Sequence, residues 1–382
     1  MVTKTPPMGW NTWNTFGLQI NEQLILESAQ TLIESGLRDA GYTYIVMDDG
    51  WALPRRDANG RLVADPKKFP RGIAPLADEL HAMGLKLGIY SCAGLMTCGG
   101  YPGSNSYEFE DAETFASWNI DFLKYDYCYK PQHEPGDQLY RRMAMALANS
   151  GRDILLSACS WGADDTQEWI RTTGAGCWRS TSDIVDTWES VCRLAKQQKP
   201  LLPYGGVGCF NDMDMLVVGM NGNGHVGLAG CTEEQYKTHF ALWAFLGSPL
   251  MIGCDIRSMT PEVARILKNS GLIAINQDPG CRQPFSIGGS FNYAYGDQED
   301  SFVWAKLLEG GDIAIGMFNL SDSPRNLYFT LNDLSLPRFC GRKLVMTDVW
   351  TGETVETVDH RYMATVAACG CQVYRAKIVP IE

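Results

Sequence analysis

The alternation of short apolar runs with helix-like segments is the feature that most constrains how this chain can fold. Between residues 8 and 278, eight apolar runs typical of buried strands are each followed by a segment with helical spacing. The runs are Met8–Trp13, Tyr42–Met47, Leu85–Tyr90, Ile120–Asp126, Ile154–Ser157, Cys177–Arg179, Gly205–Phe210 and Leu250–Ile252. Eight strand-then-helix units over this length predict an α/β fold, a (β/α)8 TIM barrel.

The pattern changes after about residue 283. Short apolar runs then recur at a spacing of about ten residues between Gly, Asp, Asn and Pro turns, which is typical of an antiparallel β-sandwich. The predicted strands are Phe291–Tyr295, Phe302–Leu307, Ile313–Phe318, Leu327–Thr330, Leu344–Asp348, Thr354–Val358 and Gln372–Ala376. We therefore predict a barrel domain over residues 1–283 and a C-terminal all-β accessory domain over residues 284–382.

Charge and hydropathy restrict the partners. The net charge of −12 and the pI near 5.0 argue against nucleic acid or an anionic membrane as a partner. No uninterrupted apolar stretch reaches the roughly 18 residues of a membrane span. The first residues lack the apolar core of a signal peptide, so we expect cytoplasmic residence, with a secreted protein whose leader has been removed as the alternative. No particular oligomer is predicted.

The cysteine and histidine patterns give no metal signature. The thirteen cysteines include Cys192, Cys254, Cys369 and Cys371 in apolar segments, where a small buried hydrophobe is the expected role. C-x-x-C and H-E-x-x-H motifs are absent from the sequence, and its five histidines fall in no ligand spacing. We expect neither a catalytic metal nor a cofactor.

Carboxylates stand at the ends of three predicted strands. Asp48 and Asp49 follow the second run, Asp126 ends the fourth, and Asp183 lies just beyond the sixth. Because strand ends converge on one face of a barrel, residues far apart in the sequence can share one pocket there. Glycoside hydrolysis requires two carboxyl groups flanking the scissile bond. The pattern therefore indicates that carboxylates suited to this reaction lie at strand ends that can share one pocket.

Two basic residues and several tryptophans accompany these carboxylates. Lys124 lies two residues before Asp126 and points the same way along a strand, so we expect its charge to hold Asp126 ionised. Arg179 lies four residues before Asp183 and could orient it. Flat faces for a sugar, or simple core filling, would come from Trp10, Trp51 and Trp161.

A series of motifs carries a resemblance to a known family. The motifs, in chain order, are Pro7-Met8-Gly9-Trp10-Asn11-Thr12-Trp13-Asn14, Asp48-Asp49-Gly50-Trp51, Gly88-Ile89-Tyr90, Thr97-Cys98, Pro102-Gly103-Ser104, Lys124-Tyr125-Asp126-Tyr127-Cys128, Trp178–Ile184, Asn211–Met215 and Asn276–Pro279. Together they resemble glycoside hydrolase family 27, the α-galactosidase and α-N-acetylgalactosaminidase family. The resemblance spans residues 7 to about 283, whereas the C-terminal sheet resembles the family's accessory β-domain in length and position only.

The resemblance implies a mechanism and a set of site residues. The enzyme would remove terminal α-linked, galactose-configured sugars by a retaining double displacement, with Asp126 as nucleophile and Asp183 as general acid/base. Asp48 and Asp49 would bind the hydroxyls at sugar carbons 4 and 6. The pocket would also be lined by Trp10, Tyr90, Cys98, Lys124, Arg179 and Met215.

Cysteines mark one departure from the family pattern. Many members carry a disulfide between the loop after the first strand and the position after the Asp pair, where this chain has Leu18 and Gly50. The family's disulfide between the positions of Cys98 and Cys128 stays unassigned at this stage, because a reducing cytoplasm would keep both as thiols.

Sugar specificity depends on the motif Cys159-Ser160-Trp161, which we assign to substrate binding together with Ala163. Small residues at 160 and 163 would leave room for an acetamido group, and Ser160 could donate a hydrogen bond to it. Alternatively, Ser160 is only a smaller wall in an ordinary α-galactosidase. We place α-galactosidase first and α-N-acetylgalactosaminidase second. A β-L-arabinopyranosidase ranks lower because the Asp pair is intact, and a non-catalytic carbohydrate-binding barrel ranks last.

Overall fold

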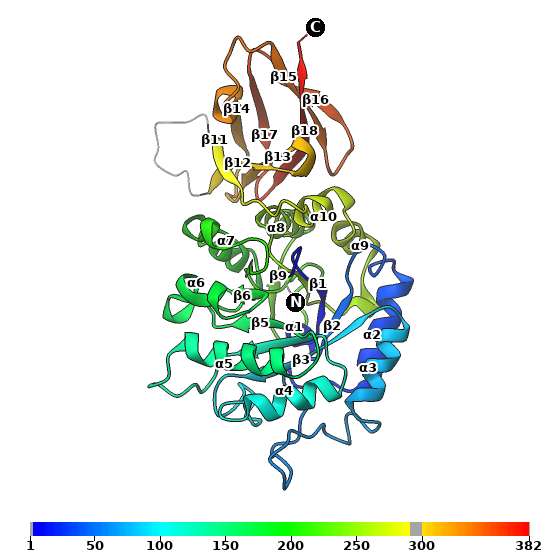
Figure 1. Ribbon diagram of the computed structural model, residues 1–382. Coiled ribbons are helices and arrows are strands. Elements are labelled where there is room, and N and C mark those ends of the chain that lie inside the picture. Colours follow the sequence, from blue (N-terminus) through cyan, green and yellow to red (C-terminus); the bar gives the residue numbers. More distant parts are fainter. Residues whose placement is uncertain (1–2, 291–299, 382) are drawn as a thin grey trace.

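The computed structural model describes residues 3–290 and 300–381, and its N-terminal part is a closed parallel barrel (Figure 1). The strands are β1 (Met8–Asn11), β2 (Tyr44–Val46), β3 (Lys86–Cys92), β4 (Phe122–Asp126), β5 (Leu155–Cys159), β6 (Cys177–Arg179), β8 (Phe210–Asp212) and β10 (Leu250–Ile252). They pair in the order β10-β1-β2-β3-β4-β5-β6-β8, and a parallel bridge between Leu216 and Ile252 joins the two ends of this sheet. The predicted (β/α)8 barrel is confirmed.

Helices surround the barrel strands. They are α1 (Trp13–Phe16), α2 (Glu22–Glu34), α3 (Ile73–Ala82), α4 (Glu108–Ser117), α5 (Gly136–Asn149), α6 (Thr166–Trp169), α7 (Trp188–Lys196), α8 (Glu233–Leu246), α9 (Pro261–Leu267) and α10 (Ser270–Asn276). Local chemistry sets their starts: Asn21 accepts a hydrogen bond from the Leu24 amide, and Thr232 forms a capping box with Gln235. Within the described residues, none of the helices combines the length and apolarity needed to span a bilayer.

One predicted barrel strand lies at a different position in the structure. The strand predicted over Gly205–Phe210 is wrong in position, because the segment from Gly205 to Cys209 makes a tight turn with Gly208 at a φ of +84°. The strand β8 begins only at Phe210. The helix α7 begins at Trp188, directly after β7 (Asp186–Thr187), which pairs with β9 (Gly227–Gly230).

The C-terminal part is an antiparallel sheet with strand order β16-β15-β18-β13-β12-β11-β14-β17. Its strands are β11 (Phe285–Ser290), β12 (Ser301–Leu307), β13 (Ile313–Asn319), β14 (Arg325–Thr330), β15 (Arg342–Asp348), β16 (Thr354–Glu356), β17 (Arg361–Val366) and β18 (Cys371–Pro380). The predicted antiparallel domain is confirmed. The strand predicted at Phe291–Tyr295 lies outside the described residues, and the boundary between residues 283 and 284 stays a prediction.

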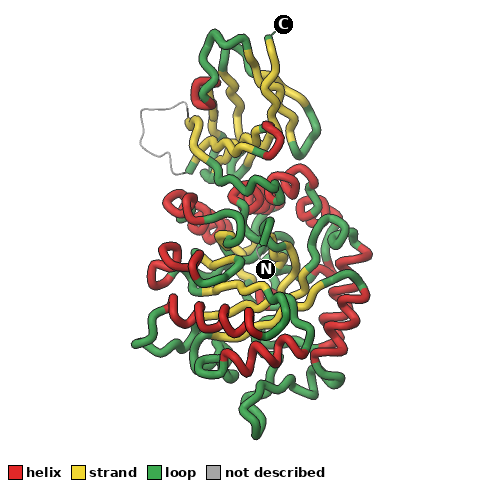
Figure 2. The backbone as a smooth tube through the Cα atoms, viewed as in Figure 1, coloured by secondary structure: helices red, strands yellow, loops and turns green. Residues whose placement is uncertain are grey.

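The C-terminal sheet packs against outer helices of the barrel domain (Figure 2). Phe318 of β13 meets Phe245 of α8 edge-on, with ring centroids 5.7 Å apart. The buried Lys306 of β12 donates hydrogen bonds to the carbonyls of Phe245 and Ile275, near the C-terminal ends of α8 and α10. Cations are favourable at helix C-termini, so this lysine ties the sheet to two barrel helices.

Candidate active site

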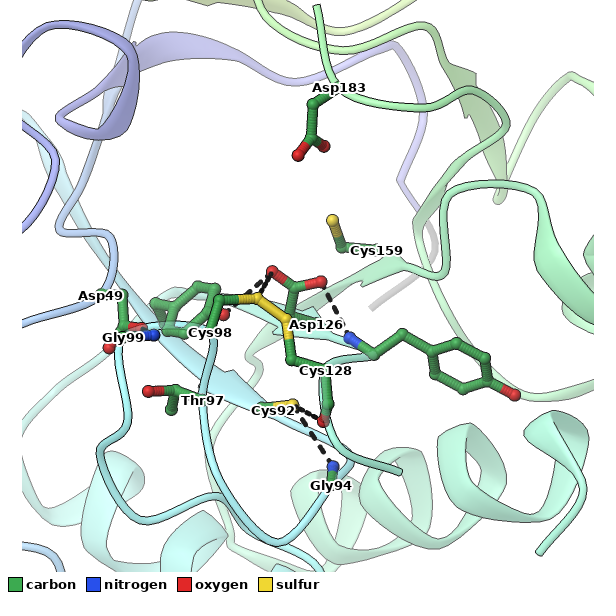
Figure 3. Close-up of a disulfide and its surroundings, with 12 residues drawn as sticks. Asp49, Cys92, Gly94, Thr97, Cys98, Gly99, Asp126, Cys128, Cys159 and Asp183 are labelled. Carbon is green, nitrogen blue, oxygen red and sulfur yellow. Dashed lines mark hydrogen bonds between the residues drawn. A yellow bond between two sulfur atoms is a disulfide. The ribbon is translucent and has the colours of Figure 1, made fainter. Parts of the chain in front are cut away.

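Strand register brings the central carboxylate to the carboxyl end of the barrel. Asp126, the last residue of β4, lies beside Cys92 of β3 and Cys159 of β5. Its Oδ1 accepts a hydrogen bond of 2.8 Å from the Tyr127 amide, and its Oδ2 accepts one of 2.9 Å from the Tyr90 hydroxyl. Two donors from different directions therefore fix the orientation of the carboxylate (Figure 3).

A cavity opens at this end of the barrel and unites side chains from most of the strands. Its lining consists of Trp13, Asn14, Asp48, Tyr90, Cys98, Lys124, Asp126, Cys159, Trp161, Arg179, Asp183, Ile184, Asp214 and Val226. Both residues predicted to be catalytic, Asp126 and Asp183, line it. Met215 lines a second cavity, which shares Lys124, Cys159, Arg179 and Asp214 with the first.

Lys124 makes its direct ion pair with Asp48. Its Nζ lies 2.8 Å from the Asp48 Oδ2, which also accepts a hydrogen bond of 2.9 Å from the Asn11 amide nitrogen. Asp48 is buried and Lys124 is partly buried, and the ion pair raises the pKa of Lys124 despite the opposing effect of burial. Lys124 is therefore a permanent cation in the cavity floor.

The net effect on Asp126 differs from the expectation that Lys124 simply keeps it ionised. Burial is the largest influence, and it raises the pKa of Asp126 above its ordinary value. The Lys124 charge acts in the opposite direction, with help from the Tyr127 amide and the Tyr90 hydroxyl. Lys124 thus limits a rise that burial imposes.

A disulfide forms one wall of the cavity. Cys98 and Cys128 are bonded, which answers the question that the sequence left open, and the Cys98 sulfur lies 3.8 Å from the Asp126 Oδ2 (Figure 3). The Gly99 amide, next to Cys98, donates a 2.7 Å hydrogen bond to Asp49. The disulfide therefore anchors the loop that holds Asp49 to the strand end that carries Asp126.

One cluster of potential metal ligands is found within the described parts of the chain, and it consists of Cys98, Cys128 and Asp126. The disulfide engages both sulfurs, so that a single carboxylate is left for coordination. Structural and catalytic zinc sites use three or four protein ligands.

Asp183 lies across the cavity from Asp126 (Figure 3) and is paired with Arg179. Its side chain is 68% exposed, and its Oδ1 accepts a 2.9 Å hydrogen bond from the Arg179 Nη2. Burial would raise the pKa of Asp183, but the charge and hydrogen bond of Arg179 outweigh it and lower that pKa. Asp126 and Asp183 therefore have pKa values shifted in opposite directions.

Four residues assigned to substrate binding line neither of the two cavities. Trp10 is fully buried and donates its indole N–H to the Cys254 carbonyl at 2.8 Å. The Ser160 hydroxyl is also fully buried and lies 2.7 Å from the Thr166 hydroxyl. The other two are Asp49 and Ala163. A binding role for these four stays a prediction.

The cavity also contains residues that were not predicted from the sequence to lie there. They are Trp13, Asn14, Ile184, Asp214 and Val226. All of these except Val226 belong to motifs already singled out, so their position after a strand was the available signal. The buried Asn14 amide nitrogen has no hydrogen-bond partner among the described residues, which leaves it free to donate to a ligand.

Known proteins resemble this chain over nearly its whole length. Residues 5–278 match the family model described as α-galactosidase A, and residues 298–376 match the α-galactosidase C-terminal β-sandwich domain. "Alpha-galactosidase 3" of Arabidopsis thaliana is 40% identical over 374 residues, which cover 98% of this chain and 82% of that protein.

Solved structures agree with the sequence matches. A putative α-galactosidase/melibiase from Bacteroides fragilis superposes with a TM-score of 0.90 at 40% identity, covering 98% of this chain and 80% of that one. An α-galactosidase from Saccharomyces cerevisiae, solved with raffinose, gives 0.87 at 27% identity and covers 98% of both chains.

The barrel, the carboxylate-lined cavity at the carboxyl ends of its strands, and these matches define the protein as a glycoside hydrolase. The chain belongs to glycoside hydrolase family 27, the α-galactosidase family, as its motifs predict.

Proposed function

We propose that the protein is an exo-acting α-galactosidase that releases terminal α-linked D-galactose with retention of configuration. The observation that carries the proposal is the pair of carboxylates, Asp126 and Asp183, that lines one cavity at the catalytic end of the barrel. Relatives named α-galactosidase at about 40% identity and the yeast enzyme solved with raffinose support a galactoside as substrate.

In the proposed first step, the Asp126 carboxylate attacks the anomeric carbon while Asp183 gives its proton to the departing glycosidic oxygen. A covalent glycosyl-enzyme forms on Asp126. In the second step Asp183 takes a proton from water, which displaces Asp126 and releases the sugar. The hydrogen bonds from Tyr90 and the Tyr127 amide support the nucleophilic role, because they hold both carboxylate oxygens in place.

Recognition of the galactose ring falls to the polar floor of the cavity. Asp48 and Lys124 present a fixed acceptor and a fixed donor there, and Asp49 is held close by through Gly99. Asp48 and Asp49 would bind the hydroxyls at carbons 4 and 6. An arabinopyranoside lacks carbon 6, so retention of both carboxylates favours a galactoside.

The contacts of Ser160 favour galactose over N-acetylgalactosamine. The hydroxyl proposed to meet an acetamido group is instead paired with Thr166, outside the cavity lining. Cys159, the last residue of β5, lines the cavity, whereas Ser160 directly after it is fully buried outside that lining.

One preparation should be assayed with nitrophenyl α-D-galactoside, α-N-acetyl-D-galactosaminide and β-L-arabinopyranoside. We expect the galactoside to be hydrolysed with the highest kcat/KM, by about tenfold or more, since a misfitting group costs on the order of 1–3 kcal/mol. A larger kcat/KM for either other substrate would replace the proposal with that specificity. Absence of turnover on all three would support a binding protein.

A further inference from the structure

The guanidinium of Arg179 is shared between two carboxylates. Its Nη2 lies 2.9 Å from the Asp183 Oδ1, and its Nη1 lies 3.0 Å from the Asp214 Oδ1. Arg179 and Asp214 are both buried, whereas Asp183 is mostly exposed. The buried Asp214 therefore holds the Arg179 guanidinium in place while the guanidinium also contacts the exposed carboxylate of Asp183.

Asp214 also holds the backbone of the loop that carries Asp183. Its Oδ2 accepts a 2.7 Å hydrogen bond from the amide of Ile184, the residue after Asp183. Asp214 itself has a left-handed φ of +80°, and its carbonyl accepts a 2.7 Å hydrogen bond from the Trp243 indole. A non-glycine residue in this conformation is strained and persists where its surroundings require it.

We propose that Asp214 is a positioning residue for the acid/base: by sharing Arg179 with Asp183 and fixing Ile184, it allows Asp183 to hold and release a proton in each catalytic cycle. The inference rests on the proposed function, because it takes Asp183 as the acid/base. Asp214 acts through Arg179 and Ile184.

The electrostatic reason is the balance of charge around Asp183. A carboxylate paired alone with a guanidinium holds its proton poorly, because the nearby cation favours the ionised form. An acid catalyst must be protonated when the substrate arrives. The negative charge of Asp214 compensates part of the guanidinium charge, so Asp183 feels a weaker cation than Arg179 alone would present.

Other charged groups face this cluster and are common to every variant below. Asp212, at the end of β8, accepts a hydrogen bond from the Asp214 amide, and burial raises its pKa to about 6. The Cys159 thiol of β5 lies 3.6 Å from Arg179. From β4, Lys124 acts on Asp183 and Asp214, and Asp126 faces the same cavity.

The test replaces Asp214 by Asn and by Gly, two neutral residues that tolerate a positive φ. The pH profile of kcat/KM on an alkyl α-galactoside, which needs acid assistance, would be measured for each. We expect the alkaline limb to move to lower pH by about one unit in both variants, which lowers kcat/KM about tenfold above the limb. An unmoved limb together with an unchanged Asp183 carboxyl pKa, or a shift of the limb to higher pH, would overturn the inference.

Asp186→Asn is the matched control. Asp186 is a buried carboxylate that also accepts a backbone hydrogen bond, from Gly222, but its side-chain partner is Tyr236. The alkaline limb of the kcat/KM profile of Asp186→Asn should coincide with that of the wild type. If neither Asp214 variant folds, Asp214 is a residue of the fold and the inference is overturned.

Titration of the Asp183 carboxyl by ¹³C NMR, assigned with Asp183→Asn, separates the inference from the proposed function. A lower carboxyl pKa in the Asp214 variants together with a shifted kinetic limb supports both. A lower carboxyl pKa with an unmoved limb supports the coupling and removes Asp183 from the acid/base role. An unchanged carboxyl pKa overturns the inference whatever the kinetics show.

Discussion

Lys124 and Asp48 form a partly buried ion pair of 2.8 Å beside Asp126. The pair places one fixed cation near a carboxylate whose pKa burial raises. The charge of Lys124 acts on both Asp48 and Asp126. A variant of either member of the ion pair therefore affects both sugar binding and the ionisation of Asp126. The pH profile separates these two effects.

Lys124→Met should move the acidic limb of the kcat/KM profile to higher pH. Lys124 lowers the pKa of Asp126, so its removal lets burial raise that pKa further, and the nucleophile ionises only at higher pH. We expect a shift of about one pH unit or more. Lys343→Met, which removes a surface partner of Glu356, is the control. A fall in rate without movement of the limb would limit Lys124 to sugar binding.

Asp183→Ala should depend strongly on the leaving group. Loss of the acid should lower kcat/KM on an alkyl galactoside by about 10²–10⁴-fold. Dinitrophenyl galactoside should be affected much less in its first step, because its leaving group departs without a proton. Equal losses on the two substrates would argue against the acid role.

Reduction of the disulfide should destabilise the protein and weaken substrate binding. Closing a loop of 30 residues contributes on the order of 3–4 kcal/mol in the chain-entropy model. Thermal unfolding with and without dithiothreitol measures the effect, and a Cys98→Ser/Cys128→Ser double variant should no longer respond to the reductant. KM should rise as well, because the freed loop carries Gly99, the hydrogen-bond donor to Asp49. A Tm that is insensitive to the reductant in the wild type would contradict this expectation.

Lys306 should give stability a distinctive alkaline dependence. Burial lowers its pKa from 10.5 to about 8, so between these values the unfolded chain binds more protons than the folded one. The stability of the wild type relative to Lys306→Met should therefore rise with pH across this window, by on the order of 3 kcal/mol. Urea unfolding of both proteins at pH 7 and pH 10 measures the difference. A difference that is constant with pH would show that Lys306 titrates normally.

Much of the fold could be predicted because apolar periodicity is a local property. Burial of both sheet faces makes β2 and β10 continuous apolar runs in the sequence. The strand over Gly205–Phe210 was predicted wrongly because Gly206 and Gly208 adopt turn conformations there. These conformations depend on the surrounding chain and not on the local sequence. The strand β17 was missed because its residues are mostly exposed, so it lacks an apolar run.

The candidate site could be predicted in its carboxylates but not in its finer contacts. Strand ends converge in any barrel, so Asp48, Asp126 and Asp183 could be brought together from the sequence alone. The partner of Ser160 and the second partner of Arg179 depend on loop geometry, which no residue pattern specifies. The direction of the Asp126 pKa shift depends on the depth of burial, which is a property of the packed barrel.

The most direct measurement of the central claim is the reaction of Asp126→Ala with an activated α-galactoside in azide, with the product followed by NMR. The wild type should release galactose with retained configuration. The variant should be nearly inactive without azide, and azide should partly restore turnover by attacking the anomeric carbon in place of the carboxylate, giving the inverted β-galactosyl azide. Near wild-type activity of Asp126→Ala without azide would contradict the account.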